Sequence, residues 1–189
     1  MKFHILYKFR DIPWGGANQF LKALRRHFKF NNSYTEDPWQ ADVIVFISYP
    51  FNSEEYYSLV YRIKKAKRGV IVLNRMNGPI SLYRDKDIEV DTMSIDFDRH
   101  VSDGTVFQSE WSRAKFMEFG YAANTNETVI PNAPDSDLFF PSFDKKNRNS
   151  RKKRIIATTW STNKKKGMNI FRYLDNNLDF NRYEMTLVG

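Results

Sequence analysis

The sequence of 189 residues contains no cysteine and few histidines, glycines or prolines. The absence of cysteine excludes disulfides, thiolate zinc sites, iron–sulfur clusters and cysteine nucleophiles. His4, His27 and His100 are the only histidines, too few for a histidine-rich metal cage. The 41% of hydrophobic and 16% of aromatic residues indicate instead a packed globular protein.

Long apolar runs are also missing. The longest, Val43–Ile47, is far shorter than the roughly twenty residues that a membrane helix needs. The start, Met1–Tyr7, reads as a strand that ends at Lys8, without the cleavage site of a secretory signal. We therefore expect a cytoplasmic protein.

The net charge of +8 lies at one end of the chain. Residues 1–143 carry 18 Lys/Arg and 18 Asp/Glu, whereas residues 144–189 carry 12 and 4. The excess falls mainly in Lys145–Arg154 and Lys164–Lys166, which read as a linker and a loop. Nucleic-acid binding would need a broad positive surface, so the pattern argues against it. The charge of the linker does permit contact with anionic lipid at a membrane surface.

Strands and helices are predicted to alternate along the first part of the chain. Five apolar runs resemble buried strands: Lys2–Tyr7, Asp42–Ile47, Val70–Leu73, Thr105–Phe107 and Thr128–Ile130. A sixth strand is expected around Ser33–Thr35. Helical spacing and capping residues predict helices over Ala17–Phe28, Glu54–Lys67, Ile95–Val101 and Ser109–Phe119. This order predicts the α/β class, with a Rossmann-like parallel sheet and helices on both faces.

The alternation restarts after the basic stretch. Arg154–Thr159 and Met185–Val188 read as strands on either side of a helix over Lys166–Leu174. This is the first βαβ unit of a second Rossmann-like domain, and alone it cannot cover both faces of its sheet. We expect a first domain over 1–143, a linker over 144–153 and a truncated second domain over 154–189.

Three loops follow predicted strands, where open parallel sheets bind ligands. They are Trp14–Asn18, Asn74–Pro79 and Trp160–Gly167. The first holds two glycines, the second a guanidinium and two amides, and the third a lysine beside a helix start. None matches the dinucleotide fingerprint or the Walker loop. Taken alone, the first loop is at least as well explained by a tight turn and the second fits an Asn-Gly turn equally well. Three lysines like those of the third loop are more commonly a solvated run of charge.

The order of five short motifs resembles glycosyltransferases of family four with the GT-B fold. The motifs are Gly15-Gly16, Gln108–Ser112, Val129–Ala133, Asp135–Pro141 and Lys166-Gly167, and they spread over essentially the whole chain. Three features depart from the family pattern. Ser161 stands where many relatives have arginine, Ala133 replaces a glycine, and the acidic E-x7-E region would follow Gly189.

The resemblance implies transfer of a sugar from a nucleotide-diphosphate sugar to an unknown acceptor, which is a glycan, a lipid-linked molecule or a small molecule. It implies retention of configuration, no cofactor beyond the sugar nucleotide and no essential metal. The diphosphate would lie at Ser161, Asn163, Lys166 and Gly167. The acceptor side or cleft would hold Gly15, Gly16, Asn18, Asn74, Arg75, Asn77 and Gly78. The hinge or cleft residues would be Gln108, Ser109, Pro131 and Asn132.

Other interpretations remain open. Asp-x-Asp triplets begin at Asp85, Asp96 and Asp135 and would suit metal-dependent transfer, but 14 aspartates produce such triplets by chance. We predict no metal. His100, near Asp98, is the one acid/base candidate, and the other histidines read as structural. A non-catalytic binding module and a nucleic-acid binder that uses the basic linker are the alternatives to an enzyme.

Overall fold

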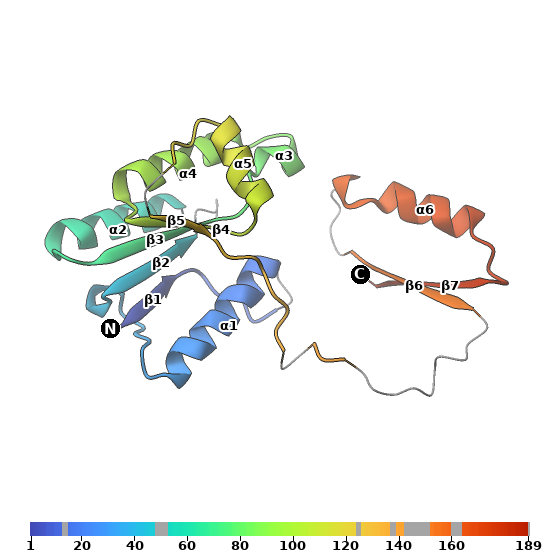
Figure 1. Ribbon diagram of the computed structural model, residues 1–189, viewed down its shortest axis with the longest axis horizontal. Helices are drawn as coiled ribbons and strands as arrows, with labels where there is room; N and C mark the ends of the chain where they lie inside the picture. The colour runs from blue at the N-terminus through green and yellow to red at the C-terminus, as the bar shows by residue number, and fades with distance from the viewer. Residues whose placement is uncertain are drawn as a thin grey trace. The chain divides into compact units, whose positions relative to one another are not determined.

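The computed structural model describes residues 1–12, 15–47, 53–123, 126–136, 139–141, 152–159 and 164–188 (Figure 1). The chain divides into two compact units, Met1–Phe139 and Phe140–Gly189.

The first unit contains five parallel strands in the order β1-β2-β3-β4-β5. The strands are β1 (Phe3–Leu6), β2 (Val43–Ile47), β3 (Ile71–Met76), β4 (Gly104–Phe107) and β5 (Glu127–Val129). The helices are α1 (Gly16–Phe30), α2 (Ser53–Ala66), α3 (Ser81–Arg84), α4 (Ile88–Val101) and α5 (Glu110–Glu118), with a 3-10 turn, η1 (Pro38–Gln40). The predicted α/β class is confirmed.

Alternate residues of β2 face different helices, because side chains alternate across a strand. Val45 and Ile47 pack with α1, and Phe46 packs with α2 and α4. Figure 1 shows α1 on one side of the sheet and α2, α4 and α5 on the other. The prediction of helices on both faces is therefore confirmed.

The direction of winding reverses beside β1. The predicted strand at Ser33–Thr35 is reduced to one parallel bridge, between Tyr34 and Phe3, on the edge of β1 away from β2. The chain thus leaves β1 through α1 to one side and returns to β2 on the other. Ligands of open α/β sheets bind outside the carboxyl ends of the strands at such a reversal.

Two elements are longer than their sequence patterns predict. β3 continues through Met76, so Asn74 and Arg75 are strand residues and their assignment to a loop was wrong. Helix α4 begins at Ile88, although the prediction began at Ile95. Both extensions include polar residues whose partners come from elsewhere in the fold: Asn74 pairs with Asp98, and Asp91 pairs with Ile80.

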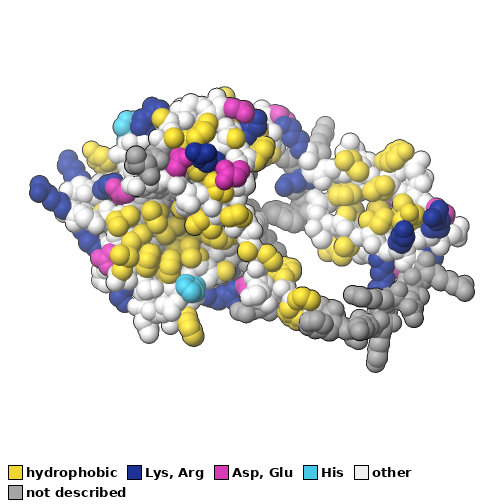
Figure 2. All heavy atoms as spheres, viewed as in Figure 1, with side chains coloured by type: hydrophobic (Ala, Val, Ile, Leu, Met, Phe, Trp, Pro, Cys, Tyr) yellow, Lys and Arg dark blue, Asp and Glu magenta, His cyan; other side chains and the backbone are white. Residues whose placement is uncertain are grey.

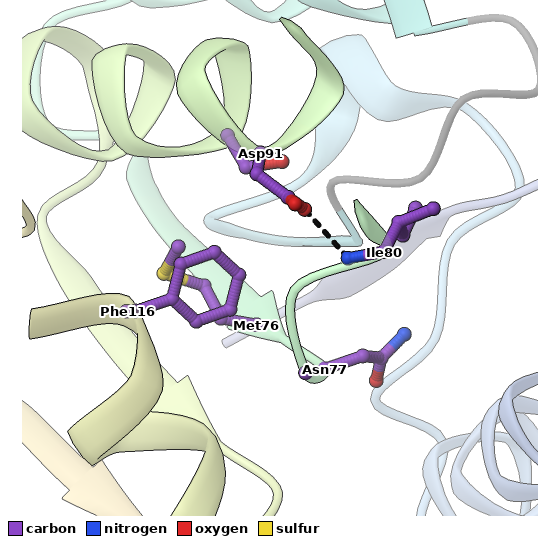
Figure 3. A pocket seen from close by; sticks show the side chains of 7 residues that line it. Met76, Asn77, Ile80, Asp91 and Phe116 are labelled. Carbon is purple, nitrogen blue, oxygen red and sulfur yellow. Dashed lines mark hydrogen bonds between the residues drawn. The ribbon is translucent and has the colours of Figure 1, made fainter. Parts of the chain in front are cut away.

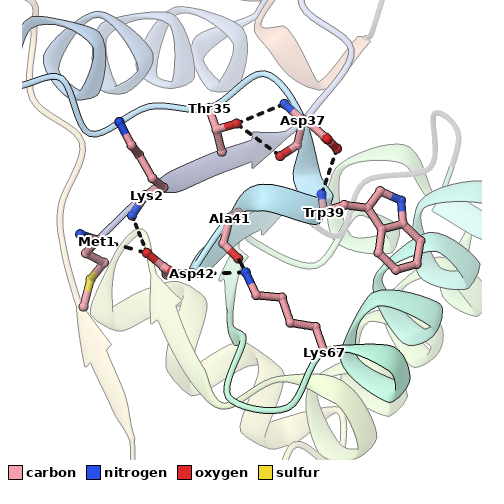
Figure 4. Close-up of polar contacts among 8 residues, drawn as sticks. All are labelled: Met1, Lys2, Thr35, Asp37, Trp39, Ala41, Asp42 and Lys67. Carbon is pink, nitrogen blue, oxygen red and sulfur yellow. Dashed lines mark hydrogen bonds and ion pairs between the residues drawn. The ribbon is translucent and has the colours of Figure 1, made fainter.

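The amino ends of the strands are closed by polar contacts (Figure 4). The carboxylate of Asp42 accepts a hydrogen bond of 2.7 Å from the backbone N–H of Lys2 and lies 3.8 Å from the ammonium of Lys67. The carboxylate of Asp37 caps η1 by accepting from the N–H of Trp39. These contacts occupy the edge opposite to the candidate site.

On the α1 side of the sheet, α1 packs against β1 and β2 and reaches β3 through Phe20. Farther along this face, Ile71 is 40% exposed and Leu73 and Val106 are half-buried. Figure 2 shows hydrophobic side chains gathered on the first unit in this view. In the part of the chain that the structure describes, no helix is long and apolar enough to cross a bilayer.

The second unit contains the predicted βαβ arrangement. Its elements are β6 (Lys153–Thr158), η3 (Lys164–Lys166), α6 (Met168–Asn177) and β7 (Tyr183–Val188), and the two strands are parallel. Helix α6 begins at Met168, two residues later than predicted, because Gly167 adopts a left-handed conformation with φ 80 as its N-cap. None of the described residues of this unit is buried, and Ile156 is 72% exposed.

His4 gives the first unit a predicted pH dependence. The residue is 8% exposed, and its Nδ1 lies 3.0 Å from the carbonyl oxygen of Thr35. Burial lowers its pKa below 6.5 despite the nearby Glu36. A base with a lowered folded-state pKa stabilises the fold above its unfolded pKa and loses that contribution as pH falls. We expect the free energy of unfolding to decrease below pH 6.5.

Chemical denaturation of the wild type and of His4→Asn at a series of pH values measures this effect. The asparagine can still donate to Thr35 but does not titrate, so the decrease below pH 6.5 should be smaller in the variant. Equal slopes in the two proteins would contradict the assignment to His4.

Candidate functional site

The candidate site surrounds Arg75, at the carboxyl end of β3. The side chain lies on the α1 side of the sheet and is only 3% exposed. Its Nη1 donates to the Oδ1 of Asn77, its Nη2 donates to the Oδ1 of Asn132 at 2.5 Å, and its guanidinium carbon lies 4.2 Å from the ring centroid of Phe20. The amide of Asn132 in turn donates to Gln108 at 3.3 Å. The structure thus joins four of the predicted site residues in one network.

The electrostatics of this network are unusual, because its cation is buried among neutral groups. Within the described residues, Arg75 forms no ion pair, and its buried Nε has no hydrogen-bond partner. Burial lowers the pKa of Arg75 to about 10, so the group stays protonated at neutral pH. A buried charge that lacks an opposite charge is unfavourable in the folded protein.

The loop after β3 is held rigidly and presents the side chain of Asn77. The hydroxyl of Ser112, on α5, donates to the carbonyl oxygen of Asn77, and the hydroxyl of Tyr83 donates to that of Gly78. The carboxylate of Asp91, on α4, accepts hydrogen bonds from Ile80 and Ser81 at the start of α3. Three helices therefore fix the loop.

A small cavity lies under the same loop (Figure 3). Asn77, Asp91 and Phe116 are among its lining residues, and its volume of about 10 Å³ is close to the room that one water needs. The carboxylate of Asp91 is turned toward the backbone of Ile80. This cavity is too small for a substrate, so it supports the loop and is not the binding site.

The glycine loop after β1 leads directly into α1. Gly15 is the N-cap residue, with φ 43, and Gly16 is the first residue of the helix. No side chain caps α1, and its first turn contains no acidic residue, so its first N–H groups are available to an anion. Asn18 is fully buried and exchanges two hydrogen bonds with the backbone of Arg10, so it shapes this loop and does not face a ligand.

Other predicted residues have structural roles or lie elsewhere. Asn74 is buried on the α4 side of the sheet, where its amide donates to Asp98, so it does not join Arg75. Ser109 caps α5 by accepting from Ser112. Pro131 is exposed beside Asn132. His100 is exposed in the last turn of α4, which leads to the amino end of β4, so it lies at the opposite edge of the sheet.

The predicted diphosphate residues belong to the second unit. Lys166 is exposed at the end of η3, and Gly167 precedes α6, which has no side-chain cap and no acidic residue in its first turn. Ser161 and Asn163 lie outside the described residues, as does Trp14 in the first unit.

The Asp-x-Asp triplets do not form an acidic cluster in the described part of the chain. Asp98, on α4, accepts hydrogen bonds from Asn74 and Thr105 of the sheet, whereas Asp96 on the same helix is exposed. Among the described residues, no three acidic or histidine side chains come close enough to hold a metal ion. The prediction that no metal is required remains a prediction.

Three contributors to the site were missed at the level of the sequence. Phe20 lies in the helix predicted over Ala17–Phe28, and it also stacks on Arg75. Trp111 and Tyr83 pack against Gly78, and no local sequence pattern predicts this contact. The alternation of side chains along β3 could have identified the face of the sheet on which Arg75 lies, since Leu73 and Arg75 share one face.

Gly78 is predicted to be required for this loop. A Cβ at this position would lie 2.7 Å from the ring of Trp111 and 3.3 Å from the hydroxyl of Tyr83, so Gly78→Ala must move one of them. We expect a loss of about 1–3 kcal/mol in the free energy of unfolding. Gly16→Ala is the matched control, because nothing lies within 4 Å of its Cβ. Equal stability of the two variants in urea would refute the close packing.

The similarity of this chain to known proteins lies in its fold. No protein-family model matches the sequence, and no curated protein matches it. A solved structure with a similar fold is that of Anabaena HepE in complex with UDP-glucose. The match covers 100% of this chain and 69% of HepE, with a TM-score of 0.61 and 13% sequence identity. At this identity, what the two chains share is their α/β fold.

Proposed function

We propose that the protein is a glycosyltransferase that uses a nucleotide-diphosphate sugar as its donor. The observation that carries the proposal is the fold, which is similar over the whole chain to that of a protein crystallised with UDP-glucose. The Arg75 network adds support, because it lies at the carboxyl edge of the sheet, close to the reversal of winding at β1.

In this proposal the donor diphosphate binds in the second unit, at Lys166 and the first N–H groups of α6. The ammonium is exposed, and the start of the helix carries no competing carboxylate. Positive side chains and helix N-termini favour the charge that develops when a nucleotide diphosphate departs. This agrees with the GT-B arrangement expected from the sequence motifs.

The acceptor binds in the first unit, at the carboxyl edge beside Arg75. Asn77 and Asn132 place amide groups there, and amides suit the hydroxyls of a sugar or a related acceptor. The reaction forms a bond between the oxygen of an acceptor hydroxyl and the anomeric carbon while the bond from that carbon to the diphosphate breaks, and the hydroxyl proton leaves with the diphosphate. Positioning and stabilisation of the leaving group supply the catalysis, with retention of configuration and without a metal.

Titration with UDP-glucose in buffer that contains EDTA tests the donor assignment. We expect binding that Lys166→Gln weakens about tenfold, because a charge-assisted contact to the diphosphate is lost. Lys65→Gln is the matched control, since Lys65 is an exposed lysine on α2 of the first unit. Calorimetry on the full chain provides the measurement.

The possible outcomes separate the functional classes. Binding together with slow release of UDP supports an enzyme, whereas binding without any turnover points to a non-catalytic module. Equal affinities in the two lysine variants would remove Lys166 from the donor site. Turnover that requires added manganese would contradict the metal-independent reaction.

A further inference from the structure

Arg75 is held by groups that accept hydrogen bonds from its terminal nitrogens but do not balance its charge. Both terminal nitrogens donate to amide oxygens, of Asn77 and Asn132, and the ring of Phe20 lies 4.2 Å from the guanidinium carbon. Buried arginines in proteins are normally paired with a carboxylate or a phosphate. The described residues supply no such partner to Arg75, although this residue is only 3% exposed.

Two described acidic groups at this edge of the sheet are engaged elsewhere. Asp135, which follows Asn132 in the chain, pairs with Arg26 of α1. Asp11, in the loop after β1, pairs with Lys22 at 3.0 Å. Among the residues that the structure describes, these pairs leave no carboxylate on Arg75 at the carboxyl edge of the sheet.

The two amide oxygens on Arg75 differ in how firmly they are held. Asn77 belongs to the loop that Ser112 and Tyr83 fix. Asn132 is exposed and follows the end of β5. The last hydrogen bond between β5 and β4 runs from the backbone N–H of Ile130 to the carbonyl oxygen of Phe107. Moving the side chain of Asn132 would expose the Nη2 of Arg75 without disturbing the sheet.

A second group that favours anions lies on the element that covers Arg75. Phe20 is in the second turn of α1, and the first turn of this helix has neither a side-chain cap nor an acidic residue. A helix start of this kind attracts negative charge. The buried guanidinium and the helix start therefore favour the same kind of ligand.

We propose that Arg75 is the receptor for an oxyanion, a phosphate or a carboxylate, carried by the acceptor, and that this oxyanion displaces the amide oxygen of Asn132. The inference rests on the proposed function and specifies its substrate class: the acceptor is anionic. An arginine fork binds such groups through two parallel hydrogen bonds, which neutral sugars cannot match.

NMR of the arginine side chains tests this with inorganic phosphate as the probe, at constant ionic strength set by chloride. The Nε–H signal of Arg75 is assigned by its loss in Arg75→Gln. We expect phosphate to shift this signal in the wild type, and Arg75→Gln to weaken phosphate binding at least roughly tenfold. Arg99→Gln removes one positive charge as well, from α4, and should bind phosphate like the wild type.

A second variant keeps the test valid if Arg75→Gln folds poorly. Asn132→Ala removes the exposed amide that the anion must displace, so phosphate should bind several-fold more tightly. Weaker binding in Asn132→Ala, or an Arg75 signal that phosphate leaves unmoved, would overturn the proposal. Glucose 6-phosphate and vesicles that contain phosphatidic acid, compared as ligands, distinguish a soluble acceptor from a lipid-linked one.

UDP-glucose titrated into the same samples separates this inference from the proposed function. Donor binding without any effect of phosphate on Arg75 refutes the anionic acceptor alone. A wild type that binds phosphate at Arg75 but no nucleotide sugar supports the oxyanion site and refutes the donor assignment.

Discussion

The guanidinium of Arg75 is buried in the first unit without a carboxylate partner among the described residues, and the candidate site is organised around this one cation. Neutral oxygens and an aromatic ring hold it in place. Such an arrangement costs stability, because a charge removed from water is compensated only by dipoles. A cost of this kind is expected at a functional site, where a ligand supplies the missing charge.

The fold explains why these groups meet. Arg75, Gln108 and Asn132 follow or end three neighbouring strands, and the carboxyl ends of parallel strands share one edge. The reversal of winding at β1 brings α1 to the other side of the sheet, where Phe20 covers the guanidinium. Residues that are far apart in the chain thus form one site, while polar contacts around Asp42 occupy the opposite edge.

The sequence predicted the strands and helices that depend on local signals. The apolar run of β2 and the Ser109 cap of α5 are examples. The sequence-based prediction failed where a polar residue has a distant partner. Asn74 was predicted to lie in a loop, because its buried partner, Asp98 of α4, is not apparent from the neighbouring sequence. The burial of Arg75 likewise depends on Phe20, which lies 55 residues earlier in the sequence. His100 lay close to acidic residues in the sequence, but the course of α4 carries it to the wrong edge.

A crystal structure of the full chain grown with UDP-glucose and inorganic phosphate is the most direct test of the role of Arg75. We predict a phosphate bound to the Nη2 of Arg75, with the side chain of Asn132 moved aside and Asn77 still in place on Nη1. A guanidinium that keeps both amide partners while phosphate binds elsewhere would contradict the central claim.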